Sequence, residues 1–304
     1  MVSEHILGAL DFDSLWKGRL RTTQVEGAIV TNLVRLVDRR RVLEGGTGDG
    51  RLSANLRREA KEYAGVDAVM KFLLRIQRKN PTHNDSELLA AANLYHLPFA
   101  ERTFTLVILV RVYNLLADPD TALMEAARVL VNGGHLLVAA QVRPSIASLV
   151  DDTRTFLQNT AGRVSLTFSH AERLPMSMTP IPTWQETIDG LLHRLISHGF
   201  DPISMRTSGL EDYIFLRHLP AVVFTGLSKT FPQMGIFPTV SILARKHGDP
   251  PPNLLPFREI LACPRCGMRM PLPDMENATL GCVHCKFTVT RTRGVLDTRL
   301  GVDH

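Results

Sequence analysis

Apolar residues along the chain fall into two kinds of segment. One kind is a short, nearly continuous apolar run, and residues 105–110 (TLVILV) are the clearest case. Such a run is typical of a strand that is covered on both faces. The other kind repeats apolar residues at helical spacing, as Val25, Ile29 and Leu33 do within residues 23–38. Strands alternating with helices predict an α/β fold on a mostly parallel sheet.

The same pattern places the individual elements. Strands are predicted at residues 42–45, 63–67, 104–110, 136–140, 200–205 and 237–244, with a further strand ahead of residue 97. Helices are predicted at residues 23–38, from residue 51, after the capping sequence at 118–120 and at 183–198. We expect Gly133 and Gly134 to end the third helix in left-handed geometry, and Gly199 to stop the fourth.

The segment at residues 42–50, VLEGGTGDG, predicts a strand that ends in a tight glycine loop and leads into a helix. Glycines there permit positive φ and let a ligand approach bare backbone. The dinucleotide pattern G-x-G-x-x-G is not met, because its third glycine falls on Arg51 or Ser53. The phosphate-loop pattern fails too, since Gly50 is not followed by Lys and Ser or Thr. What remains is E-x-G-x-G-x-G, led by Glu44.

This last pattern resembles motif I of the class I S-adenosylmethionine (SAM) methyltransferases. An acid also stands at the end of the next predicted strand. Asp67 lies 19 residues after Gly48, and an acid about 20 residues beyond the glycines commonly accepts hydrogen bonds from ribose hydroxyls. Alone, Asp67 would be interpreted as an exposed cap of the following helix. Beside Glu44 and the three glycines, the cofactor interpretation is favoured.

Residues 93–140 resemble the type 11 methyltransferase pattern in order and spacing. The matching pieces are LPF at 97–99, the strand at 104–110, ARVL at 127–130, NGG at 132–134 and the strand at 136–140. The resemblance implies a SAM-dependent methyltransferase on a Rossmann-like, doubly wound sheet of seven strands. It places the cofactor at Glu44, Gly45, Gly46, Thr47, Gly48, Asp67, Ala68, Asn93, Leu94 and Arg111. Asn93 replaces the usual acid, and its carbonyl can still accept the adenine hydrogen bond.

The expected chemistry needs few catalytic groups. The methyl group of SAM is already activated, so the protein mainly aligns the acceptor and excludes water. A general base is required only where the acceptor's pKa demands one. The candidate residues near the ends of strands four and five are Arg111, Tyr113, Asn114 and Gln141, with His96 and His170 as possible bases. A lone histidine is more often an ordinary surface or core residue. Arg111 would hold an anionic substrate or pair with a local acid.

All four cysteines lie in the last 45 residues, as Cys263, Cys266, Cys282 and Cys285. Their spacing, C-x2-C-x15-C-x2-C, is that of a zinc ribbon, in which each knuckle aims two thiolates at one metal. Two disulfides are the alternative and suit a secreted mini-domain. Four thiolates leave no open position, so the expected Zn²⁺ is structural. A unit this small depends on its metal for stability.

The cysteine-containing segment resembles the small zinc-ribbon activator subunit of tRNA and ribosome methyltransferases. The match lies in EILACPRC at 259–266, in the second knuckle and in GVLD at 294–297. The resemblance implies a unit that covers an apolar edge of its methyltransferase, here fused in cis. We predict a lead segment at residues 1–22, a methyltransferase domain at 23–247, a proline-rich linker at 248–254 and the zinc ribbon at 255–304.

Charge and hydropathy bear on partners and location. The net charge is +5, and basic residues cluster at 39–41, 57–58, 75–79 and 291–293. Such clusters attract nucleic acid, although a solvated surface also accounts for them. No apolar run approaches the ~18–20 residues of a membrane span. No signal peptide is visible, so we expect a cytoplasmic protein.

Three hypotheses follow. The first is methyl transfer from SAM to a small molecule, which is slightly favoured. The second is methylation of RNA or of a translation factor, with the ribbon and the basic clusters as a docking surface. The third is a non-enzymatic SAM-binding scaffold, and the intact glycine loop argues against it. The acceptor atom and the oligomeric state do not follow from the sequence.

Overall fold

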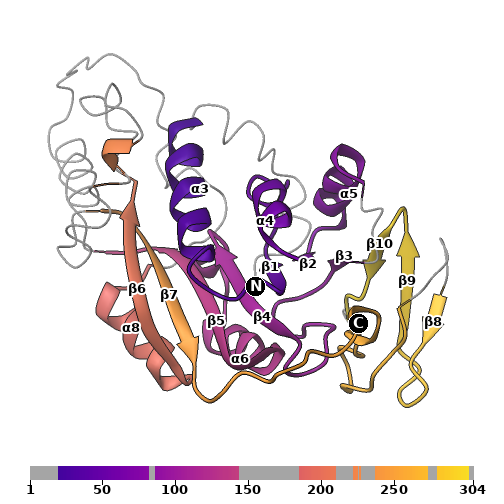
Figure 1. Cartoon of the computed structure of the whole chain (residues 1–304). Helices are drawn as coiled ribbons and strands as arrows, with labels where there is room; N and C mark the ends of the chain where they lie inside the picture. The colour runs from indigo at the N-terminus through magenta and orange to yellow at the C-terminus, as the bar shows by residue number, and fades with distance from the viewer. Residues whose placement is uncertain are drawn as a thin grey trace, which may run out of the picture.

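The computed structural model describes residues 20–81, 86–143, 185–209, 222–224, 226, 237–272 and 279–300. Within these residues, strands and helices alternate and build a ten-stranded sheet in the order β6-β7-β5-β4-β1-β2-β3-β10-β9-β8 (Figure 1). The predicted α/β, Rossmann-like architecture is therefore confirmed. None of the described helices is long and apolar enough to cross a membrane.

The strands have the following bounds: β1 (Arg41–Gly45), β2 (Glu62–Asp67), β3 (Glu87–Ala91), β4 (Phe104–Val110), β5 (Leu130–Gln141), β6 (Phe200–Ser208), β7 (Thr239–Lys246), β8 (Thr279–Gly281), β9 (Thr288–Thr292) and β10 (Val295–Asp297). The α-helices are α3 (Leu20–Val34), α4 (Ser53–Glu59), α5 (Met70–Lys79), α6 (Pro119–Val129) and α8 (Ile188–Ser197). Two 3₁₀ turns are η1 (Tyr113–Leu115) and η3 (Phe257–Glu259).

The centre of the sheet is parallel. β1 pairs in parallel with β2 and β4, and the parallel pairing continues outward to β3 and β5. β7 runs antiparallel between β5 and β6. All seven residues of β4 are buried, as the apolar run predicted for a strand covered on both faces. The carboxyl ends of β1, β2, β3 and β4 therefore meet at one edge, which is where open α/β sheets bind ligands.

Each face of the sheet has its own apolar core. α3, α4 and α5 cover one face, and α6 and α8 cover part of the other (Figure 1). Leu56 of α4 and Leu73 of α5 are buried on the first face. Leu123 of α6 and Leu191 of α8 are buried on the second. α3, the amphipathic helix predicted from apolar spacing, also packs on the first face as expected.

The sheet has ten strands where seven were predicted, because the C-terminal segment continues it. We call residues 255–300 the four-cysteine module. Its strand β10 pairs in parallel with β3, with Val295 opposite Leu89. Thr298 extends this pairing, since its N–H and its hydroxyl both donate to the carbonyl of Ala91, at 2.9 and 2.8 Å. Three-residue strands such as β10 are too short for an apolar pattern to reveal.

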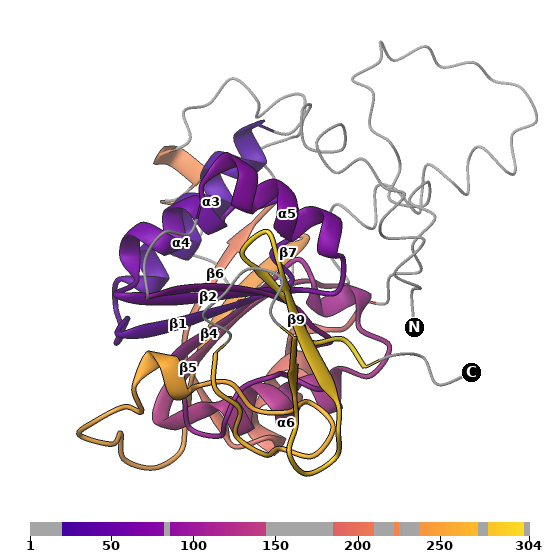
Figure 2. The same cartoon turned by 90° about the vertical axis from the view of Figure 1, so that its right-hand side faces the viewer.

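The four-cysteine module also covers the face of the sheet that α6 and α8 leave open beneath β1, β2 and β3 (Figure 2). Ile260 and Leu261 are fully buried there. Backbone bonds fasten this contact: Ala100 N–H donates to the carbonyl of Ile260 at 2.8 Å, and Ala262 N–H donates to the carbonyl of Pro98 at 3.0 Å. The module and the central strands therefore share one core.

Arg41 ties the start of β1 to the beginning of the module. Its side chain is only 2% exposed. The guanidinium donates to the carbonyl of Leu255 at 2.7 Å and to Glu62 at 2.6 Å. It also lies 5.6 Å from the ring centroid of Phe257, a cation–π distance. Arg41, one of the three basic residues at 39–41, is thus a buried link between β1 and the module and not a surface charge.

Two helix predictions need correction. α3 spans Leu20–Val34, whereas residues 23–38 were predicted. The helix ends early because Leu36, expected on the apolar face, is 65% exposed and has no core to join. α6 ends at Val129, ahead of Gly133 and Gly134, and both glycines lie in β5.

Gly133 has left-handed geometry, with φ of 68°, but it lies within β5 and not at a helix end. A Cβ atom at Gly133 would lie 3.0 Å from the carbonyl oxygen of Gly248 and 2.8 Å from Pro250. The glycine is therefore required by the close approach of the linker. It also coincides with the register shift between β4 and β5.

The remaining elements agree with the sequence within a few residues. α4 begins at Ser53 and not at Arg51. α8 begins after the N-cap Thr187, whose hydroxyl accepts from Gly190 N–H, and Gly199 follows its end with φ of 81°. Residues 183–184 of that predicted helix lie outside the described residues.

Candidate functional site

The glycine loop after β1 is a tight turn, and neighbouring side chains leave its backbone uncovered at one residue. Gly46 N–H and Thr47 N–H both donate to the carbonyl of Val66, at 2.8 and 3.1 Å. Gly46, Gly48 and Gly50 have φ of 74°, 54° and 87°. A Cβ atom would clash with Val112 at Gly46 and with Ile76 at Gly50, at 2.7 Å in each case, but would meet nothing within 4 Å at Gly48. Gly48 is therefore where a ligand can approach the backbone.

Asp67 lies against this uncovered residue. One carboxylate oxygen accepts the Gly48 N–H at 2.8 Å, and the other accepts the Val69 N–H at 2.9 Å. The second bond closes an Asx-turn ahead of α5, whose N-cap Val69 has no side-chain cap, so Asp67 contacts the loop and is not the helix cap of the alternative interpretation. The structure therefore brings together the two features from which a cofactor site was predicted.

Glu44 lies beneath the loop and not in the open space above it. Its side chain is 5% exposed and accepts hydrogen bonds from the hydroxyls of Ser53, at 2.7 Å, and Tyr63. Burial raises the pKa of the Glu44 carboxyl to about 7, against the effect of these two bonds. Burial also raises the pKa of Tyr63 well above its usual value. Glu44 thus links the start of α4 to β2 and supports the loop from below.

The residues that follow β3 lie at the same edge of the sheet as the glycine loop and Asp67. Ala92 N–H donates to the carbonyl of Asp67 at 3.0 Å, which holds the ends of β2 and β3 together. The side-chain oxygen of Asn93 accepts from Tyr95 N–H at 3.0 Å. Leu94 packs closely on the loop, since a Cβ atom at Gly45 would lie 2.9 Å from it. Ala68, directly after Asp67, is half-buried.

Arg111 pairs with a local acid, Glu26 of α3, at 2.7 Å. Arg51, from the end of the glycine loop, pairs with the other oxygen of the same carboxylate. Glu26 is fully buried. Burial opposes its ionisation, but the charges of Arg111 and Arg51 outweigh that effect and lower the pKa of Glu26. The sequence analysis missed Glu26, although an acid on the apolar face of a helix was a signal that could have found it.

The backbone at Arg111 is unusual for a residue with a side chain. Its φ is 63°, and its N–H donates to the carbonyl of Ala139 on β5 at 3.1 Å. Left-handed geometry at a non-glycine residue is uncommon and directs the chain sharply out of β4. The turn aims the guanidinium at α3, so α3, the glycine loop and the end of β4 meet at Glu26.

Tyr113 is fully buried and its phenol donates to Glu186 at 2.9 Å. Burial, with the nearby carboxylate of Glu186, raises the pKa of the phenol well above its usual value. Arg194 donates to both Glu186 and Asp120 and so joins α8 to α6. Tyr113 therefore acts as a hydrogen-bond donor at neutral pH and is not a base. Glu186 and Arg194 had no motif by which the sequence could identify them.

The other candidate residues differ in their surroundings. The side-chain amide of Asn114 donates to the carbonyl of Gln141 at 3.0 Å, and its oxygen accepts from Gln141 N–H at 2.7 Å. Asn114 thus fixes the ends of β4 and β5 to each other. His96 is exposed in the turn that follows Asn93. His170 lies outside the described residues.

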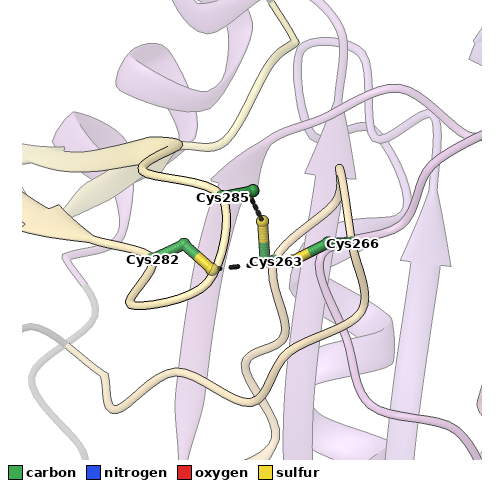
Figure 3. A group of neighbouring side chains, drawn as sticks. All are labelled: Cys263, Cys266, Cys282 and Cys285. Carbon is green, nitrogen blue, oxygen red and sulfur yellow. Dashed lines mark hydrogen bonds between the residues drawn. The ribbon is translucent and has the colours of Figure 1, made fainter.

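The four cysteines form a single cluster in the four-cysteine module (Figure 3). Their sulfur atoms all lie within 4.8 Å of one another. Cys263 and Cys285 approach to 3.5 Å, and Cys266 and Cys282 to 3.6 Å. These distances are far beyond the ~2.05 Å of a disulfide bond. A tetrahedral zinc with Zn–S bonds of about 2.3 Å requires sulfur atoms about 3.8 Å apart, so the cluster fits that metal.

Two matched turns present these thiols. Gly267 N–H donates to the carbonyl of Cys263 at 2.8 Å, and Lys286 N–H donates to the carbonyl of Cys282 at 3.0 Å. Gly267 and Lys286 are both left-handed, with φ of 74° and 63°. The backbone N–H of Cys285 donates to the Cys282 sulfur and lowers the pKa of that thiol to about 6. The structure therefore contains the predicted pair of knuckles, each of them a tight turn that presents two thiols.

Comparison with known proteins bears on the identity of this site. Residues 43–138 match the family model described as a methyltransferase domain. No curated protein sequence matches the chain. The fold is similar to that of a SAM-dependent methyltransferase, a possible histamine N-methyltransferase, from Thermotoga maritima, with 17% identity and a TM-score of 0.54 over 80% of this chain and 100% of that one.

Two further solved structures are similar. One is the complex between the Haloferax volcanii Trm112 methyltransferase activator and the putative methyltransferase, with 15% identity, a TM-score of 0.50 and coverage of 77% of this chain and 97% of that one. The other is a putative S-adenosylmethionine-dependent methyltransferase from Listeria monocytogenes, with 14% identity, a TM-score of 0.50 and coverage of 74% and 99%. At these identities the likeness is one of fold. Residues 43–138 thus contain a methyltransferase domain, and the described chain has the fold of SAM-dependent methyltransferases.

Proposed function

We propose that this chain moves the methyl group of SAM to a nucleophilic acceptor by direct displacement, at the edge formed by the ends of β1, β2, β3 and β4. The observation behind this proposal is the open backbone at Gly48 with the Asp67 carboxylate beside it. A loop whose backbone is uncovered at Gly48, next to an acid at the end of the second strand, suits a ribose-bearing ligand.

Different residues would contact different parts of the cofactor. The backbone of Gly46, Thr47 and Gly48 would contact the amino-acid part, Asp67 the ribose, and Asn93 with Leu94 the adenine. SAM, when bound, supplies a methyl group on a sulfonium that needs no further activation. The protein's task is then to fix the acceptor in line and to exclude water, and alignment alone supplies roughly 7–11 kcal/mol.

The acceptor side is built by the ends of β4 and β5. Asn114 fixes these two strand ends to each other, and the buried Tyr113 fixes Glu186. Arg111 and Arg51 both pair with Glu26 and hold α3 against the loop. We propose that these residues position the acceptor side and that none of them needs to exchange a proton during transfer.

We further propose that Cys263, Cys266, Cys282 and Cys285 bind one structural Zn²⁺. The matched turns and the tetrahedral spacing of the sulfur atoms support this proposal. With that metal, residues 255–304 would be a zinc ribbon joined by the linker at 248–254 to a methyltransferase domain at 23–247. The ribbon would act in cis as the cover of the β3 edge, the role that its resemblance to activator subunits implies.

The decisive experiment is a transfer assay with methyl-labelled SAM against small-molecule and RNA acceptors, preceded by calorimetry of SAM binding. We expect SAM to bind, native mass spectrometry to show one zinc per chain, and label to appear in one acceptor class. Binding of SAM without transfer to any acceptor would favour the non-enzymatic scaffold. No binding of SAM to the folded, zinc-loaded protein would overturn the proposal.

A further inference from the structure

Two basic clusters that lie far apart in the sequence meet on one surface of the fold. α5 contains Lys71, Arg75, Arg78 and Lys79, and residues 288–296, which form β9, the turn after it and the start of β10, contain Arg291 and Arg293. Neither residues 70–80 nor residues 288–296 contain an aspartate or a glutamate. More than 200 residues of sequence separate the two segments, so their positive charges come together only on folding. We call this the α5–hairpin surface.

A direct contact joins the two segments. Gly294, in the turn between β9 and β10, has φ of 79°, and a Cβ atom there would lie 2.6 Å from the side chain of Gln77. Arg293 precedes this glycine and Arg78 follows this glutamine, so both flank the contact. Both views show the hairpin reaching α5 (Figures 1 and 2). The approach follows from the pairing of β10 with β3, over which α5 packs.

The charges that flank this contact differ from those of many other arginines, which are paired with acids, among them Arg39 with Glu59 and Arg41 with Glu62. Arg78, Lys79 and Arg293 are exposed, and none of them has an ion pair within the described part of the chain.

We propose that the α5–hairpin surface binds the phosphate backbone of RNA and that this RNA is the acceptor of the methyl group. The inference therefore rests on the proposed methyl transfer. Guanidinium groups suit phosphate because their planar set of donors matches its oxygens. α5 begins three residues after Asp67 and its ten residues span about 15 Å. A strand lying along α5 would thus lead to the cofactor edge.

An anionic membrane is a poorer fit than RNA. Peripheral membrane helices expose apolar residues that enter the lipid. Three large apolar residues of α5, Phe72, Leu73 and Ile76, are buried in the core, and the other two, Met70 and Leu74, are partly buried against it. The exposed large apolar residues of the described chain lie elsewhere, at Leu36, Met124, Ile196, Ile203, Val222, Val223, Met268 and Val283. The surface thus presents charge without an apolar anchor.

The test compares two charge-matched variants of the full-length, zinc-loaded protein. The first is Arg78→Glu with Arg293→Glu. The control is Lys61→Glu with Arg269→Glu, which changes net charge equally and lies on neither α5 nor the hairpin; Lys61 and Arg269 are both exposed. Binding of a fluorescent tRNA transcript is followed by anisotropy between about 50 and 200 mM salt, and SAM binding is measured by calorimetry on the same samples.

We expect the first variant to lose at least tenfold in RNA affinity at low salt. Its salt dependence should also become shallower, by about 0.7–0.9 in slope for each phosphate that the protein no longer neutralises. The control should bind RNA as the wild type does, and both variants should bind SAM normally. Should charge reversal disturb folding, Arg78→Gln with Arg293→Gln is expected to give a smaller decrease in affinity in the same direction.

Three results would overturn the inference. One is an equal fall in RNA affinity in both variants, and another is no RNA affinity in the wild type at low salt. The third is equal or tighter binding to phosphatidylserine vesicles or to a poly-glutamate peptide, which would assign the surface to a membrane or to an acidic protein. Each of these leaves methyl transfer standing if SAM still binds, whereas a wild type that fails to bind SAM would count against the proposed function itself.

Discussion

At the scale of single residues, the glycine loop after β1 depends on which of its glycines tolerate a side chain. Gly46 and Gly50 are required by packing, because a Cβ atom at either would clash with Val112 or Ile76. Gly48 has the same left-handed backbone but no neighbour within 4 Å. Packing within the described chain thus leaves the space beside Gly48 open, and this is the space that we propose the cofactor uses.

Gly48→Ala should separate binding from stability. We expect SAM affinity to fall at least tenfold, because the added methyl group occupies the space through which the ligand meets the backbone. The free energy of unfolding should fall by only about 1–2 kcal/mol, the cost of left-handed geometry at alanine. Calorimetry gives the first quantity and urea unfolding gives the second.

Gly199→Ala is the matched control for that variant. Gly199 is also left-handed, with φ of 81°, and its nearest neighbour to an added Cβ atom is 3.9 Å away. It should lose similar stability and keep its affinity for SAM. An equal fall in affinity in both variants would mean that Gly48 acts only through stability.

Glu44→Gln should change how stability depends on pH. The folded pKa of Glu44, about 7, lies above the unfolded value of 4.5. Folding thus favours the protonated carboxyl, and this contribution is lost as the pH rises from about 4.5 to about 7. Glutamine resembles the protonated form at every pH. The difference in unfolding free energy between variant and wild type should grow in favour of the variant by on the order of 3 kcal/mol across this window.

Urea unfolding at a series of pH values, without cofactor, measures this difference. A difference that stays constant from pH 4.5 to pH 8 would show that folding does not raise the pKa of Glu44. Because wild type and variant share every other titrating group, the carboxylates with lowered pKa, such as Glu26, cancel in the comparison.

At the scale of elements, strong local patterns were predictable and tertiary ones were not. β1 and β2 follow from short apolar runs that end in glycine or an acid, and β4 follows from its continuous apolar run. The two knuckles follow from cysteine spacing. β10 could not be predicted, because its three residues form a strand only by pairing with β3. Glu186 and Arg194 could not be identified from the sequence for the same reason, since only the packing of α8 brings them to Tyr113 and Asp120.

Leu296→Ala tests whether β10 belongs to the core of the whole chain. Leu296, on β10, is 1% exposed and shares an apolar cluster with residues of the central strands. Truncating a buried leucine typically costs about 2–5 kcal/mol. We expect a single thermal transition at a lower temperature, with Leu280→Ala on the half-buried β8 causing a smaller drop. Two transitions, of which only one moves, would show that the module unfolds independently.

At the scale of the whole molecule, the four-cysteine cluster, our proposed zinc site, supports strands at the centre of the sheet. The buried Cys263 lies in the same apolar cluster as Phe99 and Leu43. Thr298 and β10 meanwhile hold β3, whose carboxyl end leads to Asn93. Zinc binding, SAM binding and global stability are therefore expected to be linked.

Cys266→Ser should expose this link, because Cys266 is exposed and its replacement removes a metal ligand without opening a cavity. We expect less than one zinc per chain by native mass spectrometry, a fall in the melting temperature of several degrees and weaker SAM binding. Met268→Ser, at a side chain in the same turn that is 41% exposed, is the control and should keep the metal. Normal zinc content in Cys266→Ser would contradict the four-ligand site.

The fusion of the module to the sheet that it covers has a kinetic and stoichiometric consequence. A short tether such as residues 248–254 typically keeps its two ends at effective concentrations in the millimolar range. An interface with a dissociation constant of about 10 µM would then be occupied roughly 99% of the time, however dilute the protein is. Cover and catalytic sheet are synthesised one to one from a single message, so the pair needs neither balanced expression nor a search for its counterpart.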